Sequence, residues 1–242
     1  MSAPGQEDWY WCRHTNGEGT WSTRVGRRTP EGPPGADLAA LRRGLGREPW
    51  SVAAMWPFYV LADQPQNPAQ KYTAEQAAEH AALTLFAVHQ QAQERPMHRA
   101  RVGLGTAVLV LRRHYDSPRP GLPGKVEQAD GAAAEPQRGN GLAADATQVD
   151  WSRVHPVDRR FTAATTATGP TELVLHLRGL VTQLRGIGQP LDYTRLHEDL
   201  CLWQDPRRAG EVRRRWGMQY FTRVKRAPAT TPEDTTDTEE TP

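Results

Sequence analysis

Apolar residues recur along the chain at intervals of three and four positions, which is the spacing of an α-helix with one buried face. The clearest case is the segment LVLHLRGLVTQLRGIGQPLDY, residues 173–193. Wound at about 3.6 residues per turn, its apolar side chains form one stripe: Leu173, Val174, Leu177, Leu180, Val181 and Leu184. This pattern predicts a helix packed against a core.

Three more helices are predicted in the first half of the chain. DLAALRRGLG begins at Asp37, a candidate N-cap, and KYTAEQAAEHAALTLFAVHQQ contains Thr73 and Gln76 at the spacing of a capping box. MHRARVGLGTAVLVLRRHY has an apolar second half and a basic end, which suits the negative C-terminal end of a helix. Together these segments predict an N-terminal helical bundle.

Two further helices follow the 173–193 segment. Asp192 is a candidate N-cap for DYTRLHEDLCLW, and Asp205 with Pro206 supplies an N-cap and an N1 proline for RRAGEVRRRWGMQYFTRVK. Their apolar stripes are Tyr193, Leu196, Leu200 and Trp203 in the first, and Val212, Trp216 and Tyr220 in the second. No segment is a convincing strand.

The predicted fold is all-α, with an N-terminal and a C-terminal helical bundle joined by a flexible insertion. The insertion is rich in turn signals and poor in large apolar residues, as expected of a disordered linker. The predicted divisions are a Trp-rich N-terminal arm (1–36), the N-terminal bundle (37–115), the insertion (116–149), the C-terminal bundle (150–226) and an acidic disordered tail (227–242).

Composition is typical of a soluble globular protein. Of 242 residues, 37% are hydrophobic and 24% are charged, and no apolar run approaches the roughly 18 residues of a membrane span. The opening MSAPGQEDWYW lacks the parts of a signal peptide, so a cytoplasmic protein without membrane contact is expected. Cys12 and Cys201 are far apart and predict free thiols.

Charge is distributed unevenly. The formal net charge is +2, but the last twelve residues, TPEDTTDTEETP, hold five acids and no base, so the rest of the chain carries +7. The excess lies in the central, arginine-rich part. A basic body of this kind is the electrostatic footprint expected of a nucleic-acid-binding protein.

No motif for catalysis or for a cofactor is apparent. The chain has no P-loop, and GLG at 103–105 is too short for a dinucleotide turn. HEDLC at 197–201 is one residue away from the zinc-protease pattern, but no third ligand accompanies it. We therefore expect no enzymatic activity, no cofactor and no bound metal.

Aromatic residues and histidines admit structural explanations. Docking of the N-terminal arm onto the core is favoured over base stacking for three tryptophans: Trp9, Trp11 and Trp21. Capping or surface roles are expected for three histidines that recur at nine-residue intervals: His80, His89 and His98.

The 173–193 segment carries two arginines that a helix does not need. Arg178 and Arg185 lie seven residues apart, one above the other on one flank of the apolar stripe. Neither has an acid three or four positions away, so no intrahelical ion pair neutralises it. Their charge is met by a neighbouring helix, by solvent or by a phosphate, and the helix alone leaves these alternatives open.

Several segments occur in the same order in one known family. The chain resembles CasB, the small subunit of the type I-E Cascade CRISPR complex, in AALRRGLGREP (39–49), LFAVHQQ (85–91), MHRARVGLG (97–105), RRF (159–161), HLRGLVTQLR (176–185) and PLDYTRLHEDLCLWQDP (190–206). The ordered set covers most of residues 37–221. One departure is Thr106, which follows Gly105 where the family often has an arginine.

The resemblance implies an all-α, non-enzymatic protein that sits as two copies in a guide-RNA complex, beside its large, backbone and guide-RNA-end subunits. It further implies contacts with CRISPR RNA and target DNA, through which a basic surface stabilises the R-loop in antiviral defence. R-loop formation is a near-balanced exchange of duplexes, so protein contacts to the backbone can tip it. Arginine, with planar donors that match phosphate, suits such contacts.

The candidate nucleic-acid-binding residues are eight arginines: Arg42, Arg43, Arg99, Arg101, Arg159, Arg160, Arg178 and Arg185. Arg159 and Arg160 join the set through the resemblance, with Phe161 beside them as a core anchor. Two other functions stay open, a free-standing helical nucleic-acid-binding regulator and a purely structural assembly subunit. The first needs an exposed recognition helix, and the second predicts no salt-sensitive DNA binding.

Overall fold

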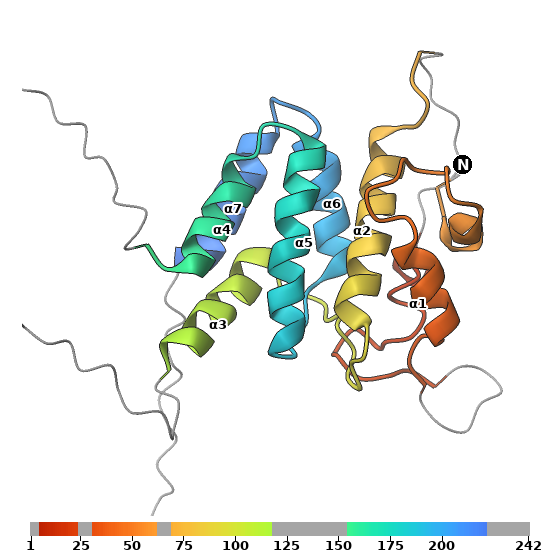
Figure 1. Cartoon of the computed structure of the whole chain (residues 1–242), viewed down its shortest axis with the longest axis horizontal. Coiled ribbons are helices and arrows are strands. Elements are labelled where there is room, and N and C mark those ends of the chain that lie inside the picture. The colour runs from red at the N-terminus through yellow and green to blue at the C-terminus, as the bar shows by residue number, and fades with distance from the viewer. Residues whose placement is uncertain (1–4, 24–30, 62–68, 118–153, 222–242) are drawn as a thin grey trace, which may run out of the picture.

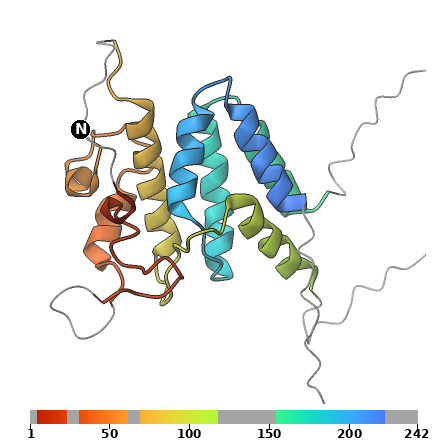
Figure 2. The same ribbon diagram turned by 180° about the vertical axis from the view of Figure 1, so that it is seen from behind.

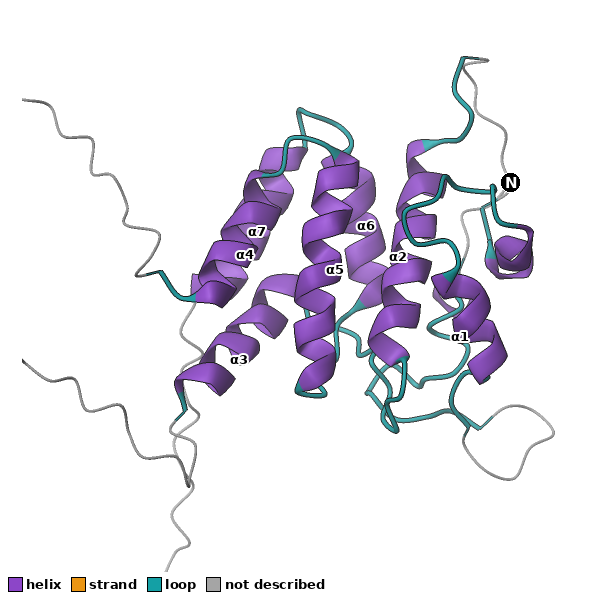
Figure 3. Ribbon diagram, viewed as in Figure 1, coloured by secondary structure: helices purple, strands orange, loops and turns teal. Residues whose placement is uncertain are grey.

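The computed structural model describes residues 5–23, 31–61, 69–117 and 154–221. Within these ranges the elements are η1 (Gln6–Asp8), α1 (Gly35–Arg42), η2 (Ala53–Phe58), α2 (Ala74–Gln90), α3 (Leu104–Asp116), α4 (Pro156–Thr166), α5 (Pro170–Gly186), α6 (Tyr193–Trp203) and α7 (Ala209–Phe221), where η marks a 3-10 helix. The described residues form helices and loops without a strand (Figure 3). The predicted all-α fold is therefore confirmed.

The helices lie side by side in an arrangement that mixes the two halves of the chain. Figure 1 and the reverse view in Figure 2 show α1 and α2 at one end, α5 and α6 in the middle, and α3, α4 and α7 at the other end. α2 packs on α5 and α6, and α3 packs on α7. The helices of the N-terminal half and those of the C-terminal half thus share one hydrophobic core.

The apolar stripes and two of the predicted caps are confirmed by the structure. Thr73 and Gln76 form the capping box of α2, and the Asp192 carboxylate accepts the backbone N–H of Arg195 at the start of α6. Most residues of the three predicted stripes are buried: Leu173, Leu177, Leu180, Val181 and Leu184 in α5, Tyr193, Leu196, Leu200 and Trp203 in α6, and Val212, Trp216 and Tyr220 in α7.

Asp37 is wrong as an N-cap, and Asp205 caps a turn that precedes α7 rather than α7 itself. α1 begins at Gly35, and the Asp37 carboxylate instead accepts a hydrogen bond from the Tyr10 hydroxyl at 2.9 Å, which ties the N-terminal segment to this helix. α7 begins at Ala209, and Asp205 lies in the turn before it, where its carboxylate accepts the backbone N–H of Arg207 and its carbonyl accepts that of Ala209, each at 2.9 Å.

The first half of MHRARVGLGTAVLVLRRHY is also not helical, because contacts distant in sequence hold it as a loop. The backbone N–H of Met97 donates to the Gln90 side chain at 2.8 Å, and that of Arg99 donates to the Leu191 carbonyl at 3.1 Å. Arg101 has a φ of +67°, in the left-handed region. Only the apolar second half continues as α3.

The N-terminal segment docks on the core, as predicted. Trp9 and Trp11 are buried and stacked with ring centroids 5.2 Å apart, and the Trp11 indole N–H donates to the Thr194 hydroxyl at 3.0 Å. The Trp21 indole N–H donates to the Glu94 carbonyl at 2.8 Å. Trp9 and Trp11 therefore present no free ring face on which a base can stack.

A glycine allows α3 and α7 to approach closely. A methyl group at Gly105 would overlap the main-chain carbonyl oxygen of Trp216 and lie 2.7 Å from the Cβ of Gln219. The Gly105 N–H also donates to the Gln219 side chain at 3.2 Å. The glycines at 103–105 thus have a packing role that their sequence context does not reveal.

In the described part of the chain, no helix has the length and apolarity needed to span a bilayer. The predicted tail at 227–242 lies outside the described residues, as does the predicted insertion from 118 to 149. The divisions at 1–36, 37–115 and 150–226 stay predictions about the order of segments along the chain.

Candidate nucleic-acid interface

Arg178 lies on the solvent side of α5. Leucines on the opposite side of the helix, among them Leu177 and Leu180, are fully buried and fix this orientation. Arg178 itself is exposed, and its side chain has no acidic partner among the described residues. One turn earlier, Leu175 is 64% exposed. The outer face of α5 therefore offers an unneutralised cation beside an apolar side chain.

α4 brings two more arginines to this region. Phe161 is buried against Tyr220, with ring centroids 4.4 Å apart, and this contact leaves Arg159 and Arg160 exposed. α4 packs along α5 (Figure 1). At this contact, Nη1 of Arg160 lies 3.4 Å from the position that a Cβ of Gly179 would occupy. Arg160 thus reaches the residue next to Arg178 in α5.

Among the described residues, the acids of α4 and α5 form no ion pair with these arginines. Asp158 accepts hydrogen bonds from Arg112, at 3.2 Å, and from the Tyr220 hydroxyl. Glu172 accepts from the backbone N–H and the hydroxyl of Thr168 at 2.8 and 2.9 Å. These hydrogen bonds hold the pKa of the Glu172 carboxyl below its usual value. We call the three exposed arginines of these two packed helices, Arg159, Arg160 and Arg178, the α4–α5 arginine surface; of the three, Arg160 lies at the contact between the helices.

Arg185 behaves differently from Arg178, although both have the same sequence signature. Nη1 of Arg185 donates to the Val88 carbonyl and to the Gln91 side chain, each at 3.3 Å. α2 ends at Gln90, so the guanidinium neutralises the negative C-terminal end of that helix. The C-terminal end of α2 therefore supplies hydrogen-bond acceptors for the guanidinium of Arg185.

The remaining four candidates lie elsewhere. Arg42 ends α1 and Arg43 is its C-cap, and α1 stands at the end of the molecule opposite α4 (Figure 1). Arg99 and Arg101 are exposed on the loop before α3, where the backbone N–H of Arg101 donates to Asp192 at 2.7 Å. The eight arginines thus divide into separate groups rather than gathering in one place.

Other arginines serve the packing of α6 and α7. Asp199 is 2% exposed and accepts hydrogen bonds from Arg215 and from the Trp216 indole, the latter at 2.5 Å. Burial raises the pKa of this carboxyl, and its hydrogen-bond donors act in the opposite direction. The guanidinium of Arg213 lies 4.8 Å from the ring centroid of Trp203. These cations have partners within the fold.

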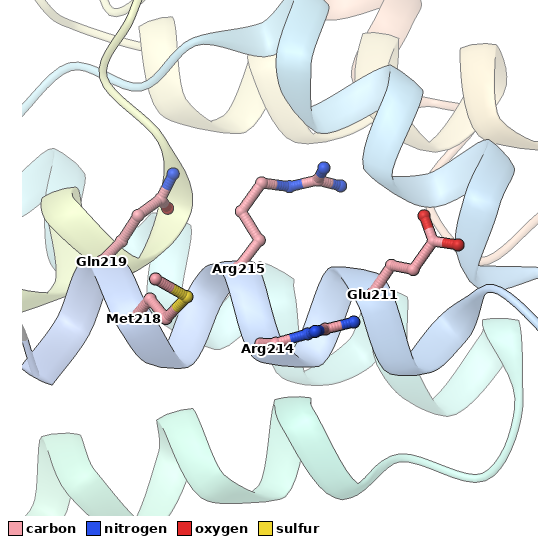
Figure 4. Close-up of a pocket in the computed structure, with 5 residues that line it drawn as sticks. All are labelled: Glu211, Arg214, Arg215, Met218 and Gln219. Carbon is pink, nitrogen blue, oxygen red and sulfur yellow. The ribbon is translucent and has the colours of Figure 1, made fainter.

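α7 also borders a shallow groove of about 550 Å³. All five lining residues project from this helix (Figure 4): Glu211, Arg214, Arg215, Met218 and Gln219. Arg214 is exposed, whereas Arg215 turns toward Asp199. Consecutive arginines here point in different directions, as the 100° step of a helix requires.

The histidines are structural, and the expected surface roles are wrong. His80 lies between Gly44 and Tyr59, and Nδ1 of His98 accepts the backbone N–H of Tyr193 at 3.1 Å, a contact that caps α6. Nδ1 of His89 lies 2.9 Å from the Tyr193 hydroxyl. Burial lowers the pKa of His89 to about 3 and that of His98 to about 4. Both side chains are therefore neutral near pH 7.

The HEDLC segment, residues 197–201, makes contacts inside the fold rather than a metal site. His197 is buried, packs on Trp9 and approaches the Cys201 sulfur at 3.6 Å. Burial raises the pKa of the Cys201 thiol to about 12, which disfavours the thiolate that zinc binding requires. Within the described ranges, no three His, Cys, Asp or Glu side chains gather as metal ligands do.

Comparison with known proteins identifies the family to which the chain belongs. The family model of CRISPR-associated protein Cse2 matches residues 37–221. The fold is similar to that of CasB from Thermobifida fusca, with 27% identity, a TM-score of 0.51, and coverage of 78% of this chain and 85% of that chain. CasB from Thermus thermophilus is similar at 20% identity and a TM-score of 0.45, over 77% and 85% of the two chains. No curated protein matches the chain.

Proposed function

Because the chain belongs to the CRISPR-associated protein Cse2 family, we propose that it is the small, non-catalytic subunit of a type I-E Cascade complex. In this role it assembles, as two copies, with the large, backbone and guide-RNA-end subunits around CRISPR RNA and target DNA. Its contribution is to bind the nucleic-acid backbone without sequence preference and so stabilise the R-loop.

The α4–α5 arginine surface is the observation that carries the nucleic-acid part of this proposal. Three exposed guanidiniums lie on two helices that pack together, and the nearby acids hydrogen-bond to other groups. A phosphate chain supplies the missing negative charge, and arginine can bind it bidentately. Guide pairing reads the sequence, so such contacts need charge and reach rather than base-edge recognition.

The test is R-loop opening by a reconstituted guide complex, followed by permanganate footprinting of the displaced strand. Complexes contain the wild-type protein, no small subunit, or the R159A/R160A/R178A variant. A control variant, R47A/R95A/R207A, removes the same charge from exposed arginines on other segments that have no acidic partner among the described residues. It separates the chosen surface from net charge.

We expect the R159A/R160A/R178A complex to assemble but to lose its open strand as salt rises, while the control resembles wild type. Losing three phosphate contacts lowers the slope of log affinity against log salt by about two to three. If the variant assembles and opens DNA like wild type at every salt concentration, these arginines do not bind phosphate. The purely structural assembly role would then be favoured.

A further inference from the structure

The chain leaves its last helix beside the arginines of α4. The Tyr220 hydroxyl donates a hydrogen bond to Asp158, and the Tyr220 ring packs on Phe161. Asp158 and Phe161 directly flank Arg159 and Arg160 in sequence. Phe221, which ends α7 and is 78% exposed, therefore lies near the segment of α4 that carries Arg159 and Arg160.

Beyond Phe221 the sequence has three bases, Arg223, Lys225 and Arg226, and then an acidic end whose charge is opposite to that of the surface. Residues 222–242 lie outside the described part of the chain, but their sequence is known: the last twelve hold five acids and no base. The five are Glu233, Asp234, Asp237, Glu239 and Glu240. The first of them is twelve residues beyond Phe221, a length of chain that spans at most about 40 Å.

We propose that the acidic segment 231–242 binds the α4–α5 arginine surface of its own chain and competes there with nucleic-acid phosphate. This inference rests on the proposed function, because it assigns a second ligand to the same surface. Each exposed ion pair is weak, but a short tether gives the segment an effective concentration in the millimolar range. The segment thus suppresses stray binding, and a strand that the guide complex positions displaces it.

The test neutralises the segment without shortening it, in a variant with Glu233→Gln, Asp234→Asn, Asp237→Asn, Glu239→Gln and Glu240→Gln. Its affinity for a fluorescent single-stranded oligothymidine is measured by anisotropy at low salt, beside wild type. The same neutral tail is then combined with R159A/R160A/R178A. This fourth protein separates an effect on the surface from the general effect of removing five negative charges.

We expect the neutral tail to tighten binding about tenfold, the change that three weak ion pairs together produce. The gain should shrink to about twofold or less when the three arginines are absent, and rising salt should abolish it. A peptide of residues 231–242, added to the neutral-tail protein, should restore the weaker binding in a manner that depends on these arginines.

Two results would overturn the inference and leave the proposed function in place. One is DNA binding that requires the three arginines but has the same affinity with the wild-type tail and with the neutral tail. The other is an equal gain with and without the arginines, which would show that the acids act on other cations, such as Arg223 and Lys225, which precede them in the same terminal segment. If removing the arginines leaves DNA affinity and R-loop opening unchanged, the proposed function fails and this inference fails with it.

Discussion

Replacing Gly105 with alanine should destabilise the protein, although alanine is the better helix former. Gly105 lies in the first turn of α3, where that helix meets α7. The added methyl group would overlap the Trp216 carbonyl oxygen, which belongs to the α7 backbone. A main-chain atom cannot rotate out of the way as a side chain can, so the two helices must separate.

The magnitude follows from two opposing effects. Overpacking of this kind typically costs about 1–3 kcal/mol, and the upper part of that range applies because a helix separation of about 1 Å loses much of the dispersion energy along the contact. Alanine returns up to about 1 kcal/mol of helix propensity. The expected net loss is about 2 kcal/mol, or a fall in Tm of about 4–8 °C for a domain of this size.

Urea unfolding followed by circular dichroism measures the effect, with Gly217→Ala as the control. Gly217 lies in α7, and a methyl group there meets no atom within 4 Å. The control should gain about 0.5–1 kcal/mol, so the two substitutions differ in sign. If both variants are more stable than wild type, α3 and α7 do not approach each other as described.

Three further predictions concern Arg185, the buried histidines and Trp11. Arg185→Ala removes a donor at the end of α2 and should cost about 1–2 kcal/mol in urea unfolding, whereas Arg178→Ala should cost less than about 0.5 kcal/mol. His89→Gln should flatten the pH dependence of stability: burial lowers the pKa of His89 to about 3, so wild type loses up to about 1.4 kcal/mol per pH unit as pH falls from 6.5 toward 4, because only the unfolded chain takes up that proton. Urea unfolding of both proteins at pH 7 and pH 5 measures this difference. An equal loss of unfolding free energy between the two pH values in wild type and variant would contradict the prediction. Trp11→Ala should cost about 3–5 kcal/mol, since its ring is fully buried and its indole hydrogen-bonded, and a change below 1 kcal/mol would show that the N-terminal segment does not dock.

Most of the helical framework could be predicted from the sequence, because caps and apolar stripes act within one or two turns. The stripe of α5 and the capping box of α2 are of this kind. The start of α3 could not be predicted, because contacts with Gln90 and Leu191 hold the preceding loop. The glycine contact between α3 and α7 also joins segments far apart in sequence, and a single glycine in a sequence does not indicate which helix packs against it.

The fate of each arginine was the least predictable feature, and the reason is physical. Arg178 and Arg185 share the absence of an acid at helical spacing, but Arg185 finds a neutral partner, a main-chain carbonyl 97 residues away at the end of α2. Arg215 finds its acid 16 residues away on α6. A sequence shows which acids are near along the chain, whereas the carbonyls at a helix end become ligands only in the tertiary fold. Of the four arginines on α4 and α5 that were predicted to bind nucleic acid, Arg159, Arg160 and Arg178 have no acidic partner among the described residues. Under the proposed function, these three should contribute more than Arg185 to the salt dependence of R-loop opening.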